Sequence, residues 1–115
     1  MSGEFEEKFE SRTSSKPKKK PAGMTLEKAI EMGEYDPEYL SVFAEWHNLT
    51  KMMQWQYVRE AIKNRKRFLL RQWAEIFNIL DFSSKPQLAE AMKNIEKQQK
   101  KLAEDEERLQ VEFSF

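Results

Sequence analysis

The sequence predicts an all-α protein in which two long helices fold back on each other as an antiparallel, coiled-coil-like hairpin. Three observations predict this fold. The 115 residues are 35% charged yet 12% aromatic, which suits elongated helices that carry a narrow apolar stripe. Two long stretches without glycine carry seam residues at intervals of seven. Only a short segment with serine and proline separates them, and a short connection makes neighbouring helices antiparallel.

Residues 1–23 are predicted to form a disordered N-terminal tail. They are rich in Ser, Lys, Glu and Pro, and their only large apolar side chains after the initiator are Phe5 and Phe9. So little apolar surface does not offset the entropy lost on ordering. Two origins stay open, a functional tail and an extension from an upstream start site. The helical domain is expected to span residues 24–115.

One or two short helices are expected to cap the hairpin. A helix over about residues 25–32 has Thr25 in position to cap its start and Gly33 just past its end. Asp36 is followed by proline, a specific start signal for a second short helix over about residues 37–46.

The first long helix is expected over about residues 50–80 and the second over about residues 85–111. Each has a seam of residues at alternating intervals of three and four, apolar at both ends and polar midway. The first seam comprises Trp55, Val58, Ile62, Arg65, Leu69, Gln72, Ile76 and Ile79. The second comprises Leu88, Met92, Ile95, Gln99, Leu102, Glu106, Leu109 and Phe113.

The turn between these helices sets their register. If it centres near Ser84, residues whose numbers add to about 168 lie opposite each other. This register places Arg65 near Leu102 and Glu106, so that the polar seam positions meet. Ser84 and Gln87 also fit a capping box at the start of the second helix.

A cationic stripe on the first long helix is one candidate site. A helix face of this kind can bind phosphates, and the tail contributes further lysines. The candidate nucleic-acid contacts are Arg59, Lys63, Lys66, Arg67, Lys16, Lys18, Lys19 and Lys20. The competing interpretation is that the acidic block Glu104–Glu107 on the facing helix neutralises the stripe. The net charge of zero favours the second interpretation, because small RNA-binding proteins are usually basic.

Aromatic and apolar residues beyond the seam form the other candidate site. They exceed what a single facing helix covers, and the short N-terminal helices are expected to bury part of the excess. The candidate partner contacts are Trp46, Met53, Tyr57, Trp73 and Phe77.

Several classes of function are disfavoured. The chain has no cysteine and one histidine, His47, so we expect no metal site and no disulfide. No catalytic or phosphate-cradling motif occurs, so we expect no enzymatic activity, no cofactor and no small-molecule substrate. No apolar run approaches the roughly 20 residues of a membrane span, so we expect a soluble, cytoplasmic protein.

The first hypothesis for function is a non-enzymatic helical interaction or assembly module, with a protein partner or a second copy of itself. The second is a small RNA- or ribosome-associated protein that uses the cationic stripe and the tail lysines. The third is a subunit of an enzyme whose site forms only on oligomerisation. The sequence matches no family known to us.

Overall fold

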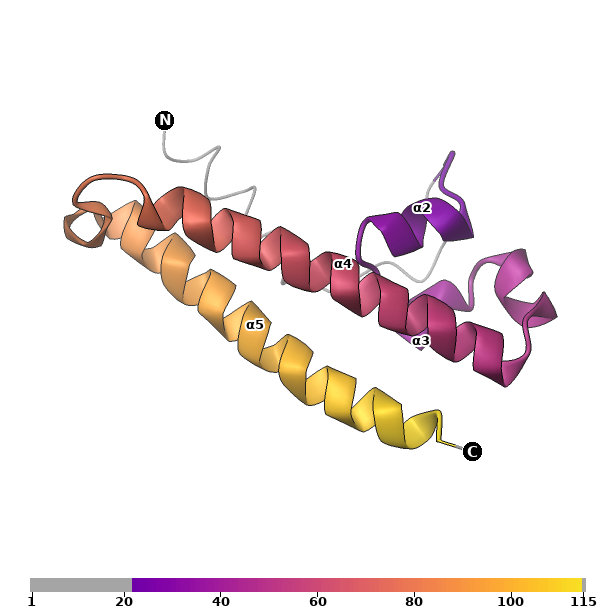
Figure 1. Cartoon of the computed structure of the whole chain (residues 1–115). Helices are drawn as coiled ribbons and strands as arrows, with labels where there is room; N and C mark the ends of the chain where they lie inside the picture. The colour runs from indigo at the N-terminus through magenta and orange to yellow at the C-terminus, as the bar shows by residue number, and fades with distance from the viewer. Residues whose placement is uncertain (1–21, 115) are drawn as a thin grey trace.

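The computed structural model describes residues 22–114 and is all-α, without a strand in that range. The tail predicted for residues 1–23 therefore lies almost entirely outside the described residues. In chain order the elements are α2 Leu26–Glu31, α3 Pro37–Leu40, the 3-10 helix η1 Ala44–Asn48, α4 Lys51–Phe77, the 3-10 helix η2 Phe82–Ser84 and α5 Pro86–Glu112 (Figure 1). The predicted antiparallel hairpin with short N-terminal helices is confirmed.

Helices α4 and α5 run side by side in opposite directions (Figure 1). Each has 27 residues, which makes it about 40 Å long. Trp55 stacks on Phe113, and the indole nitrogen of Trp73 donates to Glu96. The numbers of these two pairs add to 168 and 169, so the predicted register is confirmed.

The core follows the predicted seams and extends into the N-terminal elements. Its largest fully buried side chains come from α4, α5 and the segment around α3: Leu40, Phe43, Val58, Ile62, Leu69, Ile76, Ile95 and Leu109. Short helices cannot persist without such packing, because isolated helices of this length are unstable in water. The N-terminal segment is therefore part of the fold and not an appendage.

The N-terminal elements cover only one half of the hairpin. The side chain of Asn64 donates to the carbonyl of Ile30, and that of Gln54 donates to the carbonyl of Trp46. These contacts lie in the half of α4 remote from the turn, where α2 and α3 are seen beside it (Figure 1). We call this the open half. In the turn half, the described residues contribute only α4, α5 and the 3-10 helix η2 of the turn itself.

Two local predictions were wrong. The second short helix ends at Leu40 instead of residue 46, and the chain is extended at Phe43 before η1 begins. The hydroxyl of Ser41 donates to the carbonyl of Glu38, a local bond that competes with helix continuation. The extended residue carries the fully buried side chain of Phe43 into the core.

The capping box before α5 does not form. Ser84 donates to the carbonyl of Asp81, and the cap position of α5 is Lys85, without a side-chain cap. Asp81 has a left-handed backbone with φ of 57°, which aspartate tolerates better than most residues. The turn is thus longer than predicted, because α4 ends at Phe77 rather than near residue 80.

Candidate interaction surface

Arg65 joins the N-terminal segment to α4. Its side chain is 6% exposed and pairs with Glu34, with 2.7 Å between Arg65 Nη2 and Glu34 Oε1. Arg65 Nε also donates to the carbonyl of Gly33 at 3.1 Å. A buried charge is tolerated only with such partners. These bonds fix the end of α2 on the open half of the hairpin.

Tyr35 extends this attachment to α5. Its hydroxyl donates to Asp105 Oδ2 at 2.7 Å. Burial raises the pKa of Tyr35 above its ordinary value, and the bond to Asp105 and the charge of that carboxylate raise it further. Asp105 also lies 3.4 Å from Lys101 and 3.6 Å from Arg108 on its own helix. One segment of five residues, 31–35, therefore leads from α2 to both long helices.

The predicted approach of Arg65 to Glu106 is wrong. Glu106 pairs instead with Lys66, at 2.8 Å between Oε1 and Nζ, and both side chains are more than a third exposed. Arg65 points away from this pair because the carbonyl of Gly33 and the carboxylate of Glu34 lie closer to it. The sequence seam did not account for a third element that packs against the same helix.

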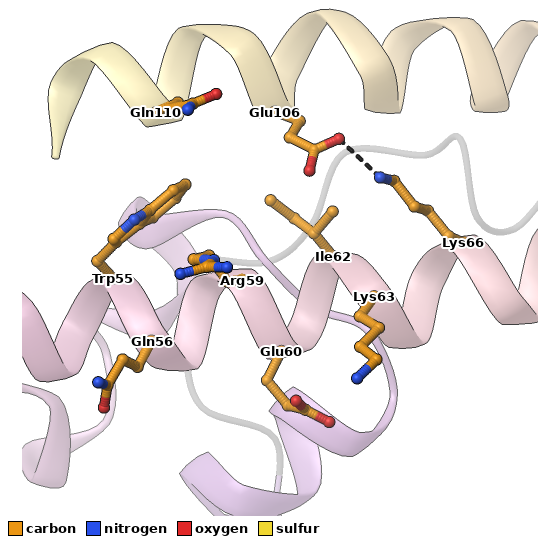
Figure 2. A pocket seen from close by; sticks show the side chains of 9 residues that line it. All are labelled: Trp55, Gln56, Arg59, Glu60, Ile62, Lys63, Lys66, Glu106 and Gln110. Atoms are coloured by element: carbon orange, nitrogen blue, oxygen red, sulfur yellow. Dashed lines mark ion pairs between the residues drawn. The ribbon is translucent and has the colours of Figure 1, made fainter. Parts of the chain in front are cut away.

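A groove of about 610 Å³ separates α4 from α5 in the open half. It is lined by Trp55, Gln56, Arg59, Glu60, Ile62, Lys63, Lys66, Glu106 and Gln110. Figure 2 shows Lys66 reaching across to Glu106, with Trp55 and Arg59 between the two helices and Lys63 directed away from α5. The guanidinium carbon of Arg59 lies 5.9 Å from the centre of the Trp55 ring.

Neutralisation of the cationic stripe by Glu104–Glu107 is limited to one ion pair. Within residues 22–114, Lys66 is the stripe residue paired with that acidic block. No described carboxylate forms a salt bridge with Arg59, Lys63 or Arg67. All three are exposed. The stripe therefore keeps most of its charge available on the surface of α4.

An apolar cluster is exposed in the turn half. Leu70 is 60% exposed and Phe77 54% exposed, and Leu80 in the turn is 81% exposed. The rings of Trp73 and Phe77 stack with 4.7 Å between centroids, and the ring of Phe82 lies 5.9 Å from that of Phe77. Large apolar side chains gathered on a surface commonly mark a binding site.

The five candidate partner contacts are not equivalent in the structure. Trp46 is 6% exposed and belongs to the core, so its ring is not presented to a partner. Met53 is 44% exposed in the open half, whereas Tyr57 is partly buried against the core. Trp73 and Phe77 lie together in the apolar cluster. Lys16, Lys18, Lys19 and Lys20 lie outside the described residues.

Leu70 and Leu80 were not among the predicted contacts. Leu70 was detectable, since it lies three residues before Trp73 and seven before Phe77, on one helix face. Leu80 was assigned to a helix that in fact ends three residues earlier, so its exposure in the turn was not predictable from spacing.

Gln72 is the one described side chain whose buried polar atoms lack a hydrogen-bond partner in the protein. It is 2% exposed, and neither its amide nitrogen nor its amide oxygen has a partner among the described residues. Polar groups at seam positions cost stability but can fix register and oligomeric state. Gln72 lies in the turn half, between Leu70 and Trp73 along α4.

The described residues contain no group of three or more metal-ligating side chains of the His, Cys, Asp and Glu types. His47 Nε2 lies 2.6 Å from the carbonyl oxygen of Ser41, so this ring nitrogen serves a local bond. No helix among residues 22–114 has both the length and the apolar character needed to traverse a lipid bilayer.

Comparison with protein families, curated proteins and solved structures returned no match to this chain.

Proposed function

We propose that this protein is a non-enzymatic helical interaction module that binds a protein partner, or a second copy of itself, through the turn half of its hairpin. The observation that carries the proposal is the exposure of Leu70, Phe77 and Leu80 where the N-terminal elements do not cover the hairpin. In the open half, the N-terminal elements pack Leu26, Ile30 and Trp46 into the core, although Met52 and Met53 at the start of α4 stay exposed. The proposal keeps the cytoplasm as the compartment, because a chain without cysteine suits a reducing environment.

Affinity capture from a lysate of the source organism tests the proposal when variants are compared. The test variant carries Leu70→Glu and Phe77→Glu, which place charges in the apolar cluster. The matched control carries Met32→Glu and Val111→Glu, which change two other apolar residues that are 45% and 74% exposed. We expect a protein that is retained by the wild type and the control but lost from the test variant. Equal capture by all three chains would contradict the proposal.

A second candidate function is RNA binding through the cationic stripe. It is favoured by the groove lined by Arg59, Lys63, Lys66 and Trp55, in which Arg59 lies over the Trp55 ring, since cations together with an aromatic ring suit single-stranded RNA. Arg59→Gln, Lys63→Gln and Arg67→Gln together should then weaken RNA binding and flatten its dependence on salt. Loss of the captured protein after nuclease treatment would favour this candidate over the first.

A further inference from the structure

The exposed side of α4 carries a second seam. Arg59, Lys63, Lys66, Leu70, Trp73 and Phe77 follow one another at intervals of four and three, the spacing of residues that face a neighbouring helix in a coiled coil. We call these six residues the outer stripe. Asn64, which bonds to Ile30 of α2, points to the other side of α4, roughly 100° to 180° around the helix from each of them. No described helix covers the outer stripe except at the edge that meets α5, where Trp73 is partly buried against the core.

The outer stripe changes character along its length. Its first three residues are cationic and its last three are apolar, and the change falls between Lys66 and Leu70. Both parts border α5, because Lys66 pairs with Glu106 and Trp73 bonds to Glu96. A third helix laid along this border would contact cations over one half and apolar side chains over the other.

The electrostatic balance of this side favours an acidic occupant. Arg67 flanks the outer stripe, about 40° around the helix from Lys63, and is exposed like Arg59 and Lys63. Of the four cations on this side of α4, only Lys66 forms a salt bridge with a described carboxylate, that of Glu106. The other carboxylates beside the stripe, Glu60 and Glu96, leave the charges of Arg59, Lys63 and Arg67 without a salt bridge among the described residues. Complementary charge steers association and fixes the orientation of the bound segment.

The protein already holds one segment of this kind. Residues 25–38 contain five carboxylates against one lysine, and they pack Leu26, Ala29 and Ile30 into the core. Their Glu34 forms the ion pair with Arg65 of α4. Helix α4 thus accepts an acidic amphipathic segment on one side and presents cations beside apolar residues on another.

A second copy of the chain is a poor match for the whole outer stripe. A two-fold axis parallel to α4 would bring cations against cations, and an axis perpendicular to its middle would bring cations against apolar residues. Two copies match only where the apolar part of one outer stripe lies on the apolar part of the other, with the two turns overlapping. This arrangement leaves the cations of both copies without partners.

We propose that the outer stripe binds an amphipathic helix of a protein partner, acidic in the part that lies over Arg59 and Lys63 and apolar in the part that lies over Leu70 and Phe77. This inference rests on the proposed function and assigns its partner a chemistry. The bound helix lies parallel to α4. In this orientation the acidic part of the bound helix is its N-terminal part, where the helix dipole also favours carboxylates.

A pair of synthetic peptides tests the inference with the full chain. Each has about 21 residues, or three heptads. The first has Glu at the seam positions of its N-terminal half and Leu at those of its C-terminal half. The second has Lys in place of every Glu. Fluorescence anisotropy of labelled peptides at low and moderate salt gives the affinities. We expect the acidic peptide to bind at least about 10-fold more tightly than the basic one, with a gap that narrows as salt rises.

Two variants locate the binding. Arg59→Glu with Lys63→Glu should reverse the preference, so that the basic peptide binds more tightly. Leu70→Glu with Phe77→Glu should lower the affinity of the acidic peptide at least about 10-fold. The control with Met32→Glu and Val111→Glu should bind as the wild type does. Circular dichroism shows whether each variant remains helical.

Several outcomes would overturn the inference. Failure of the acidic peptide to bind, or equal binding of both peptides, would remove the acidic helix as the occupant. Binding that appears only after deletion of residues 1–21 would make the chain's own N-terminus the occupant. A dimer in sedimentation that Leu70→Glu dissociates would assign the surface to a second copy, and tighter binding of a uridine oligonucleotide would assign it to RNA. If the peptides fail but capture still depends on Leu70 and Phe77, the proposed function stands and only the partner chemistry is wrong.

Discussion

The backbone at Gly33 lies directly against Arg65: a Cβ atom at position 33 would stand 3.0 Å from the Cα of Arg65 and 3.1 Å from its Cβ. Gly33 also has φ of +82°, in the left-handed region that other residues adopt at a cost. The close approach brings the carbonyl of Gly33 within reach of Arg65 Nε. Both the conformation and the space at this position therefore require glycine.

Gly33→Ala should destabilise the protein by about 2 kcal/mol or more, because the left-handed conformation and the backbone clash both oppose a Cβ atom. Gly23→Ala is the matched control, since Gly23 has φ of +76° but no atom within 4 Å of the added Cβ. Its cost should be about 1 kcal/mol, from conformation alone. Chemical denaturation of both variants measures the difference. Equal losses would mean that α2 moves away from α4 without penalty.

Arg65→Leu should destabilise the fold by about 3 kcal/mol, because it leaves Glu34 and the carbonyl of Gly33 without their buried partner. In a double-mutant cycle with Glu34→Gln, the two changes should be coupled by about 1 kcal/mol or more. The same cycle with Glu106→Gln should be additive within about 0.5 kcal/mol, since Glu106 pairs with Lys66. Strong coupling of Arg65 to Glu106 would restore the register contact that the structure excludes.

Gln72→Met should stabilise the protein by about 1 kcal/mol, because it removes two buried polar atoms that have no partner in the protein and keeps a similar volume. Thermal unfolding measures the gain. We also expect the variant to show more than one oligomeric state by light scattering, since a polar seam residue restricts the alternatives. A variant less stable than the wild type would show that the amide contributes a favourable interaction.

The raised pKa of Tyr35 predicts a specific loss of folding stability at alkaline pH. Its pKa is raised in the folded state, so above the ordinary value near 10 the unfolded chain loses this proton while the folded chain still holds it. The contribution of Tyr35 is therefore present below pH 10 and declines as the pH rises further. Tyr35→Phe should be less stable than the wild type at pH 7, and the gap should narrow between pH 10 and 11. A difference in stability between the wild type and Tyr35→Phe that does not change with pH would contradict the raised pKa of Tyr35.

The sequence predicted the parts of the fold that depend on local signals and periodicity. The caps at Thr25 and Asp36 form as expected, with bonds to Lys28 and Glu38. The hairpin register followed from the heptads of the two long helices. Contacts involving three elements were beyond such reasoning, because no periodic pattern relates Arg65 to Glu34 or Tyr35 to Asp105.

The candidate surface was predictable in part for the same reason. Trp73 and Phe77 were recognised as apolar residues outside the seam, and in the structure their rings stack, with Phe77 exposed and Trp73 partly buried. Trp46 was not distinguishable from them by type or spacing. Its burial depends on how η1 folds against the open half, which is a property of the tertiary structure.

The attachment of α2 and α3 to the open half determines how the molecule presents its turn. The C-terminal end of α5 lies at the end of the hairpin opposite the turn, because the two long helices run in opposite directions (Figure 1). Any structure joined to the chain beyond this point is separated from Phe77 and Leu80 by the length of α5, about 40 Å. The surface proposed for binding at the turn is therefore about the length of the hairpin away from any structure joined to its C-terminal end.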